Sequence, residues 1–467
     1  MSTLVDSRHL DLARQLSEFD LPGPRYTSYP TADRFVEAFT PLALVQALEQ
    51  RKVQVVTSSL PLSVYVHLPF CESLCHFCAC NKIVTRQHGQ AKTYLGYIGR
   101  EIDLYTDTLG LGQPLAQLHL GGGTPTYLSD QELAGLMGKL QSSFSFTPGG
   151  DRAIEVDPRS MDVNRLRVLA SLGFNRLNFG IQDMDPAVLK SVRRVQPAAH
   201  VAGLVVASRD LGFESVNLDL IYGLPLQTAT SFARTVAAVL TLRPDRIALH
   251  AYTHQPERFK AQRHISVLDL PGPDARVAIL SQSIVSLVDA GYELIGLGQF
   301  ALPGDSLAIA KRQGRLHRNL QGYSVLPDCD QLGLGVSSIG RMGATYSQNA
   351  GNLSDYCDRL ERGRLPVVGG LALSRDDLLR RAVIMAVMCH GRVDFESIGL
   401  AFLVDFRKYF AQEMEAISRL AHSGVVVVDP DGFSLTESGW HVLVVVAMVF
   451  DRYLRDDQKR AMFSRLL

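Results

Sequence analysis

Short apolar segments alternate with amphipathic segments between about residue 60 and residue 345. The apolar segments are rich in β-branched residues and are apolar at consecutive positions, which is typical of strands buried on both faces of a parallel sheet. Helical patterns lie between most of them, for example after Ser129 and after Asp162, two residue types that favour the N-cap of a helix. We expect strands at 63–69, 115–123, 153–158, 176–182, 215–223 and 246–252, and a further one at 292–298.

The regular alternation of strand and helix predicts an α/β fold. About six such units suit a barrel or partial barrel better than an open sheet, so we predict a partial (β/α)6 barrel of the TIM type. Barrels of this type place their functional groups at the carboxyl ends of the strands. Glycine or polar residues stand at or just after several of these ends: Cys71, Gly121–Thr124, Glu155, Gln182 and Asp219.

Both ends of the chain depart from this alternation. Residues 1–55 are predicted to form an N-terminal arm and a helix, and the prolines and glycine between Pro22 and Pro30 favour an extended path within the arm. Residues 56–350 are predicted to form the barrel, and residues 360–467 a mainly helical C-terminal domain.

The C-terminal domain resembles a winged-helix unit. Helical patterns cover 374–390, 406–424 and 437–455, and a hairpin that turns at 429–432 lies between the last two. The wing is acidic, which disfavours contacts with phosphate groups. We therefore interpret this domain as a packing domain and not as a DNA-binding one.

The composition disfavours two classes of binding partner, nucleic acids and anionic membranes. Lys+Arg and Asp+Glu number 47 each, so the net charge is zero and no global field attracts nucleic acid or an anionic membrane. The apolar run at 442–450 is too short to cross a bilayer, and the N-terminus has no signal or transit character. We expect a cytoplasmic protein with no nucleic-acid partner and no membrane span. His67, His119 and His250 lie in apolar strands and are interpreted as core histidines.

Four of the seven cysteines lie in one ten-residue segment, with the spacing Cys71-x3-Cys75-x2-Cys78-x-Cys80. Soft thiolates at short spacing select iron–sulfur clusters or zinc. A structural zinc site usually takes two separated cysteine pairs. Three cysteines spaced by three and then two residues instead suit three corners of a [4Fe–4S] cluster and leave one iron open to another ligand. A zinc-stabilised nucleic-acid-binding protein is a competing hypothesis, which the zero net charge disfavours.

The C-x3-C-x2-C spacing, with Phe77 just before the third cysteine, resembles the radical S-adenosylmethionine (AdoMet) superfamily. The segment GGGTPT one βα unit later resembles that superfamily's glycine motif, in which glycines let the backbone approach a ligand. The whole set of motifs is similar to the oxygen-independent coproporphyrinogen III oxidase family over nearly the full chain: GPRYTSYPTA (23–32), GGGTPT (121–126), IEVDPR (154–159), NLDLIYGLPLQT (217–228), LHRNLQGY (316–323) and LGLGVSSIG (332–340).

This resemblance implies a reaction. A [4Fe–4S] cluster bound by Cys71, Cys75 and Cys78 would cleave AdoMet to a 5′-deoxyadenosyl radical, and Cys80 would stand outside the ligand set. The radical would start the oxidative decarboxylation of two propionates of coproporphyrinogen III to vinyl groups, giving protoporphyrinogen IX. The resemblance further implies a radical SAM form of the barrel, a second AdoMet near Gln321 and an external electron donor such as flavodoxin or ferredoxin. We expect a monomer.

The resemblance also implies the residues that contact AdoMet. Glu155 can accept a hydrogen bond from the AdoMet ammonium, Arg194 can bind its carboxylate through two parallel hydrogen bonds, and Gln182 and Asp219 suit the ribose hydroxyls. Thr253 stands where the family more often has alanine. The matching positions are Tyr65, Phe77, Gly122, Gly123, Thr124, Glu155, Gln182, Arg194, Asp219, Ile221, Thr253 and Ile339.

The sequence departs from the family pattern in two regions. Gly298 and Gln299 stand where the family usually has Asp and His; Trp440 replaces an arginine, and Val444–Val445 replace an Arg-Asn pair. Four propionates need focused cations. These departures leave two alternatives open: a divergent radical SAM paralogue that acts on another tetrapyrrole, or a heme-binding or heme-delivery protein.

Overall fold

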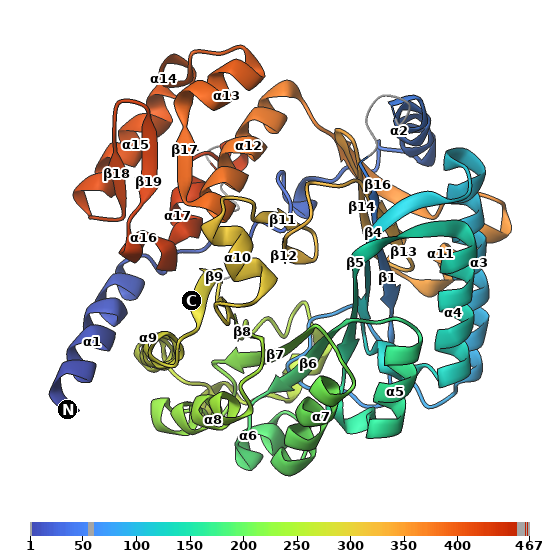
Figure 1. The fold of residues 1–467 in the computed structure, drawn as a ribbon, viewed down its shortest axis with the longest axis horizontal. Helices are drawn as coiled ribbons and strands as arrows, with labels where there is room; N and C mark the ends of the chain where they lie inside the picture. The colour runs from blue at the N-terminus through green and yellow to red at the C-terminus, as the bar shows by residue number, and fades with distance from the viewer. Residues whose placement is uncertain (1, 55–59, 455–462, 464, 466–467) are drawn as a thin grey trace.

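A curved sheet with helices on its outer face forms the centre of the computed structural model, which describes residues 2–54, 60–454, 463 and 465 (Figure 1). The predicted boundary between residues 55 and 56, and the end of the helix predicted to reach residue 455, lie outside these residues. Both the arm and the C-terminal domain lie beside the barrel, on the side where the sheet remains open (Figure 1).

The strands at the centre of the sheet run parallel in the order β13-β1-β4-β5-β6-β7-β8. The six expected strands are confirmed as β1, β4, β5, β6, β7 and β8. β1 is buried along nearly its whole length, as its continuous apolar pattern predicts. The bounds are β1 Leu62–Leu68, β4 Gln113–Gly122, β5 Phe144–Val156, β6 Arg176–Gln182, β7 Ser215–Tyr222, β8 Arg246–Ala251 and β13 Gln331–Leu334.

Antiparallel strands extend this parallel sheet at both edges. The strand expected at 292–298 is β9, and it reaches the sheet only through β10, which pairs antiparallel with β8. At the other edge β14, β15 and β16 follow β13, and the sequence analysis predicted none of these four strands. The bounds are β9 Glu293–Gly296, β10 Gln299–Ala301, β14 Ile339–Met342, β15 Thr345–Asn349 and β16 Val367–Ala372.

The helices between the parallel strands cover the outer face of the sheet (Figure 1). The two predicted N-caps are confirmed: Ser129 forms a capping box with Glu132, and the Asp162 side chain accepts from the backbone N–H of Arg165. The bounds of these helices are α3 Gly89–Leu109, α4 Asp130–Ser143, α5 Val163–Ser171, α6 Pro186–Ser191, α7 Ala198–Asp210 and α8 Ala229–Leu242. Three further helices follow β8 in the chain: α9 Pro273–Asp289, α10 Ser306–Arg312 and α11 Leu353–Glu361.

The N-terminal arm docks between the barrel and the C-terminal domain. An extended segment separates α1 (Ser2–Glu18) from α2 (Pro41–Gln54), as its prolines predict. Tyr26 and Tyr29 are buried, and the Tyr26 hydroxyl donates to Asp451 Oδ2 at 2.9 Å. Arg318 of β11 donates to the carbonyl of Tyr26. The arm is therefore fixed to both neighbours. The pair β11 His317–Asn319 and β12 Gly322–Ser324 forms a hairpin beside it.

The C-terminal domain contains the predicted wing, in which β17, β19 and β18 form a small antiparallel sheet. Two segments that were each predicted to be one continuous helix are each divided into two helices. The segment 406–424 is interrupted at Phe410, and the segment that begins at residue 437 is interrupted at Val442. The run of β-branched valines after Val442 has weak helix propensity, which is consistent with the short helices there. The bounds are α12 Arg375–His390, β17 Arg392–Asp394, α13 Phe395–Phe402, α14 Phe406–Tyr409, α15 Ala411–His422, β18 Val426–Val428, β19 Gly432–Leu435, α16 Glu437–His441 and α17 Leu443–Met448.

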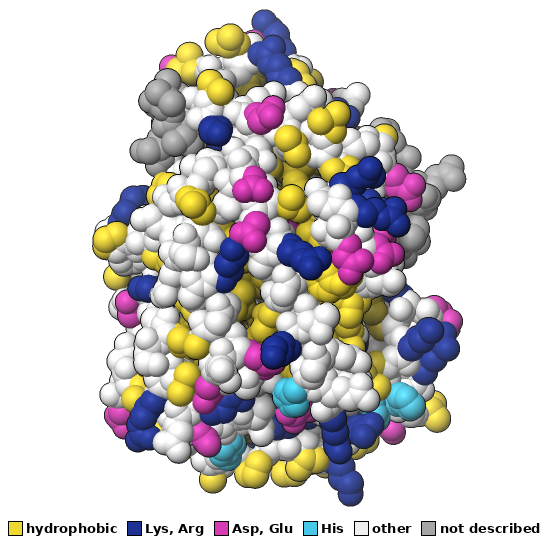
Figure 2. Space-filling view, turned by 90° about the vertical axis from the view of Figure 1, so that its right-hand side faces the viewer, with side chains coloured by type: hydrophobic (Ala, Val, Ile, Leu, Met, Phe, Trp, Pro, Cys, Tyr) yellow, Lys and Arg dark blue, Asp and Glu magenta, His cyan; other side chains and the backbone are white. Residues whose placement is uncertain are grey.

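The surface carries both signs of charge. On the face shown in Figure 2, Lys and Arg side chains are interspersed with Asp and Glu side chains. This distribution agrees with the zero net charge of the sequence. Among the described residues, no helix is long and apolar enough to span a bilayer.

Candidate active site

The cysteine loop follows β1 and covers the carboxyl end of the parallel sheet. Cys71 belongs to the two-residue strand β2 (Phe70–Cys71), which pairs with β3 (Ile83–Val84) and so closes the loop on itself. Cys71, Cys75 and Cys78 line one cavity of about 270 Å³, here called the cluster cavity. Two guanidinium groups, from Arg159 and Arg194, donate to Cys75 Sγ at 3.5 Å.

The thiols of this loop differ in acidity. Burial raises the pKa of Cys71 to about 11. A hydrogen bond from the Cys80 thiol, helped by the Lys82 ammonium, lowers the pKa of Cys78, and the same bond raises the pKa of Cys80. In this pair Cys80 is the hydrogen-bond donor and Cys78 the acceptor.

The arrangement of donor groups suits a cluster better than a single ion. In the part of the chain that the structure describes, no three His, Cys, Asp or Glu side chains converge closely enough to hold one metal ion. Tetrahedral zinc would draw its thiolates to within about 4 Å of one another. Three thiols around a common cavity, with Lys82, Arg159 and Arg194 to balance negative charge, fit a [4Fe–4S] cluster.

The glycine segment after β4 brings the cluster loop and Glu155 close together. A Cβ at Gly123 would lie 2.5 Å from the carbonyl oxygen of Pro69, and one at Gly121 would lie 2.7 Å from Glu155 Oε1. Only glycine permits this approach. As a result the Gly122 N–H donates to Glu155 Oε2 at 3.1 Å, while His119 Nε2 lies 3.2 Å from Oε1.

Arg194 is held by a partner that the sequence analysis did not single out. Its guanidinium donates to Asp157 Oδ1 at 3.2 Å and to the carbonyl of Gly180, and its Nε has no partner among the described residues. Burial raises the pKa of the Asp157 carboxyl, but Arg194 and Arg159 outweigh it and the net pKa is lowered. Asp157 stands within the segment IEVDPR, and that motif was the available signal.

Most of the predicted AdoMet-contact residues gather at two joined cavities. Tyr65 and Ile339 line a second, central cavity of about 560 Å³. Ile221 and Thr253, although described, line neither: Ile221 packs against a small separate core together with Phe77, and the Thr253 carbonyl accepts from Gln262. The residues that line the cluster cavity include Phe77, Gly122, Gly123, Thr124, Glu155, Gln182, Arg194 and Asp219.

The central cavity is polar and opens directly from the cluster cavity. Cys80, Gly122, Glu155, Asn178 and Asp219 line both. Its walls also carry the three histidines that were interpreted as core residues. That interpretation is confirmed for His67 and His119, which are buried and hydrogen-bonded although they also line the cavity. It was wrong for His250, whose side chain is 51% exposed.

The charged groups of the central cavity are mostly paired. Arg176 donates to Asp151 at 2.6 Å, and Arg246 donates to Asp305 at 2.9 Å. His67 is held between the Tyr65 hydroxyl and the Asn81 carbonyl, and burial lowers its pKa.

Comparison with known proteins identifies the family to which the chain belongs. Residues 65–239 match the Radical SAM superfamily, and residues 373–442 match the HemN C-terminal domain. The oxygen-independent coproporphyrinogen III oxidase of Pseudomonas aeruginosa is 44% identical over 459 residues, 98% of each chain, and that of Escherichia coli is 42% identical over 97% of each. The chain belongs to the oxygen-independent coproporphyrinogen III oxidase family. The solved structure of the E. coli enzyme matches with a TM-score of 0.88 over 92% of this chain and 97% of that one.

Membership of the coproporphyrinogen III oxidase family confirms the radical SAM barrel and the attached C-terminal domain. It also favours an enzyme over the heme-delivery alternative, and it identifies the expected cofactors as a [4Fe–4S] cluster and AdoMet. The described residues fit both the cluster and AdoMet, because the three thiols and the polar residues at the strand ends line the same cavity.

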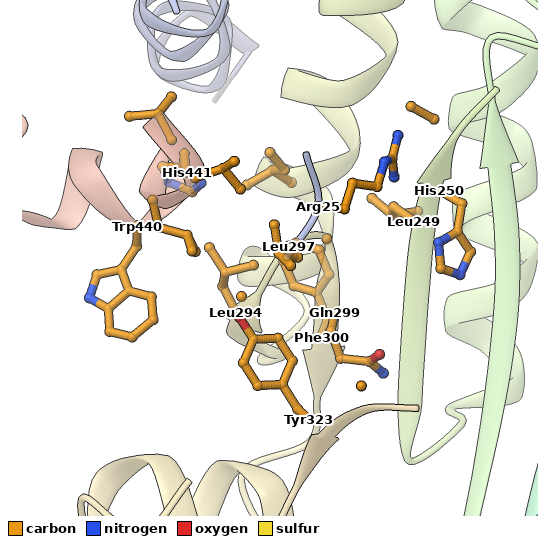
Figure 3. A pocket seen from close by; sticks show the side chains of 18 of the residues that line it. Arg25, Leu249, His250, Leu294, Leu297, Gln299, Phe300, Tyr323, Trp440 and His441 are labelled. Atoms are coloured by element: carbon orange, nitrogen blue, oxygen red, sulfur yellow. The ribbon is translucent and has the colours of Figure 1, made fainter. Parts of the chain in front are cut away.

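The five positions that depart from the coproporphyrinogen III oxidase pattern meet in one place. They line a third cavity of about 320 Å³, here called the side cavity, which lies between the barrel and α16–α17 (Figure 3). Gly298 has a φ of +71°, and a Cβ there would lie 2.4 Å from the carbonyl oxygen of Leu249, so the local backbone excludes an aspartate. The five are Gly298, Gln299, Trp440, Val444 and Val445.

Proposed function

We propose that this protein catalyses the oxygen-independent oxidative decarboxylation of coproporphyrinogen III to protoporphyrinogen IX. The observation that carries this proposal, within a family that performs this reaction, is the continuity of the cavities. The cluster cavity, which the thiols of the cysteine loop line, adjoins the central cavity of about 560 Å³, and Glu155 and Asp219 line both. A tetrapyrrole in the central cavity would therefore lie next to the place where the cofactors bind.

Cys71, Cys75 and Cys78 would hold the [4Fe–4S] cluster, and the strand ends around Glu155 and Arg194 would hold AdoMet. With one electron from a donor, the bound cluster and AdoMet would supply a 5′-deoxyadenosyl radical, with methionine as the other product. Removal of a hydrogen atom from a propionate β-carbon, followed by loss of CO2 and one electron, would leave a vinyl group. Each propionate therefore needs one electron from a donor and returns one electron to an acceptor.

The protein's own groups position the cofactor. Gly122 and His119 fix both oxygens of the Glu155 carboxylate, which then accepts from an ammonium group. Asp157 fixes the plane of the Arg194 guanidinium and leaves its Nε free to donate to a carboxylate. Lys82 donates to the carbonyls of Cys78 and Cys80 and so holds the end of the cysteine loop.

The family resemblance also implies a second AdoMet near Gln321. Gln321 lies where the central and side cavities meet, and its buried Oε1 has no partner in the described part of the chain. Its unmet acceptor supports the second AdoMet that the family resemblance implies.

We further infer the cellular setting. All seven cysteines are free, which supports a reducing compartment and hence the cytoplasm. A flavodoxin or ferredoxin would supply the electron, because these proteins deliver single electrons at low potential. We propose that the protein acts as a monomer, since one chain supplies every group named above.

The test is an anaerobic assay of the reconstituted protein with coproporphyrinogen III, dithionite and AdoMet. We expect protoporphyrinogen IX and two molecules of 5′-deoxyadenosine for each substrate consumed. The Cys71→Ala variant should make neither product. Formation of 5′-deoxyadenosine without protoporphyrinogen would refute the substrate and keep the enzyme class.

A further inference from the structure

The side cavity has a polar mouth and an apolar interior. The mouth opens to the central cavity, because six residues line both: Thr27, His250, Gln299, Gln321, Gly322 and Tyr323. Figure 3 shows His250 and Gln299 on the side of the barrel, Trp440 and His441 on the opposite side, and Leu294 and Leu297 between them. A ligand in the central cavity can therefore extend one edge into the side cavity.

The interior is lined by side chains from three separate parts of the chain. Leu280 and Ile284 come from α9, Leu294 from β9, and Val444 and Val445 from α17. At about 320 Å³ the cavity is at the small end for ligand sites, so it suits one pyrrole edge and not a whole tetrapyrrole.

Two arginines, Arg25 and Arg318, line the side cavity, and they differ in whether they can still bind a carboxylate. Arg318 is already engaged, because it donates to the carbonyls of Tyr26 and Arg25 and lies 4.8 Å from the centroid of the Tyr323 ring. Arg25 retains a buried Nη2 without a partner among the described residues. Arg25 can therefore receive one carboxylate at the wall of the cavity.

The interior itself has no such group to offer a carboxylate. His441 lines it, but burial lowers the pKa of this imidazole, so its Nδ1, which lacks a partner in the described residues, can offer a hydrogen bond and not a positive charge. Lys311 does not line the cavity; its ammonium lies against the Trp440 ring, 3.5 Å from the centroid. A propionate pushed into this interior would lose its hydration without a cation to replace it.

These surroundings discriminate between the starting tetrapyrrole and what it becomes. Each pyrrole of coproporphyrinogen carries one methyl and one propionate, so every edge bears a carboxylate. After the first decarboxylation one edge carries a methyl and a vinyl, and burial of this apolar edge is favourable. A neighbouring propionate would then lie near Arg25.

We propose that the side cavity binds the vinyl-bearing edge of the tetrapyrrole after the first decarboxylation, and so retains the mono-vinyl intermediate for the second. This inference rests on the proposed function. It makes Leu280, Ile284, Val444 and Val445 specificity-determining residues that recognise the product of the first step.

The test is a binding experiment that needs no turnover. Trp440 is the protein's one tryptophan and lines the cavity, so quenching of its fluorescence reports porphyrin binding to the full chain. The probes are coproporphyrin III and the porphyrin with one vinyl and three propionates. We expect the mono-vinyl probe to bind about ten-fold more tightly than coproporphyrin III. The two carbon atoms of its vinyl group can be buried in the side cavity, whereas a propionate would bring its charge with it.

Two variants of one residue sharpen this test. Val445→Asp should abolish the preference by placing a carboxylate in the interior, and the isosteric Val445→Thr should reduce it several-fold with little risk to folding. Val427→Asp, at a wing position that is 59% exposed, is the matched control and should leave the preference unchanged. Equal affinities for the two probes in the unmodified protein, or an unchanged ratio in Val445→Thr, would overturn the proposal.

The same variants separate this inference from the proposed function. In the anaerobic assay Val445→Asp should release the mono-vinyl intermediate, whereas the unmodified protein should release mainly protoporphyrinogen. A selective binding ratio without any turnover would refute only the proposed function. Turnover with no binding preference would refute only the role of the side cavity.

Discussion

The ammonium of Lys311 lies 3.5 Å from the centroid of the Trp440 ring and donates a hydrogen bond to the carbonyl of Leu294. Trp440 also packs against Gly391 at the end of α12, where any side chain would collide with the indole. One cation thus fixes a side chain that lines the side cavity, and it joins α10 of the barrel to α16 of the C-terminal domain.

Substitution of Lys311 should change the pH dependence of stability. Burial lowers the pKa of Lys311 from 10.5 to about 8. Between these values the unfolded chain holds more protons than the folded protein, so the free energy of unfolding rises with pH. We expect the stability of the unmodified protein relative to Lys311→Met to rise by about 2–3 kcal/mol from pH 7.5 to pH 10.5.

Urea unfolding of both proteins, followed by Trp440 fluorescence, measures this difference. Comparison of the two proteins at each pH cancels the tyrosines and cysteines that titrate in the same range. A stability difference that stays constant from pH 7.5 to pH 10.5 would contradict the prediction.

Glu101 should give the opposite slope. This fully buried residue of α3 accepts from the Tyr356 hydroxyl at 2.6 Å and from the N–H of Gly335 at 2.8 Å. Burial raises its pKa from 4.5 to about 7, so the folded protein keeps a proton that the unfolded chain loses in this range. The free energy of unfolding therefore falls as pH rises from 4.5 to 7. Over this range the stability of Glu101→Gln relative to the unmodified protein should rise by about 3 kcal/mol.

Thermal or urea unfolding at pH 5 and pH 8 checks this expectation. Gly335 begins the turn that carries Ile339 into the central cavity, so the same variant should keep its AdoMet affinity if only the charge is removed. An unchanged stability difference between pH 5 and pH 8 would show that Glu101 is not the titrating group.

The four cysteines of the loop should separate into ligands and a bystander. Serine at Cys71, Cys75 or Cys78 should reduce iron after anaerobic reconstitution well below the roughly four atoms per chain of a complete cluster. Cys80→Ser keeps a hydrogen-bond donor to Cys78 and should retain the iron and its visible absorbance. Loss of iron in Cys80→Ser equal to that in Cys78→Ser would mean that Cys80 is a ligand.

Arg194→Lys should weaken AdoMet binding about 10- to 100-fold, because an ammonium keeps the charge and loses the planar fork. Equilibrium dialysis of the reconstituted protein measures the affinity. Arg234→Lys is the control, since Arg234 is exposed, pairs with Asp185 at 3.4 Å and does not line the cluster cavity. Equal affinities in the two variants would exclude a direct role for Arg194.

The sequence alone determined the parts of this protein that depend on neighbours in the chain. The apolar pattern located the six parallel strands, because a strand buried on both faces must be apolar along its length. Ser129 and Asp162 located helix starts, and the cysteine spacing indicated a cluster, because capping and ligation act within one turn or one loop. The breaks at Phe410 and Val442 were missed because tertiary packing outweighs a continuous helical pattern.

Only the tertiary structure decided which distant residues share a surface. β13 is four residues long and becomes a strand through its pairing with β1, almost 270 positions earlier in the chain. Gly298 and Val445 read separately as departures from a family pattern, yet they line one cavity. Their meeting follows from the packing of α17 against the barrel edge, and the free energy of such packing depends on shape across the whole fold, which no local pattern of residues encodes.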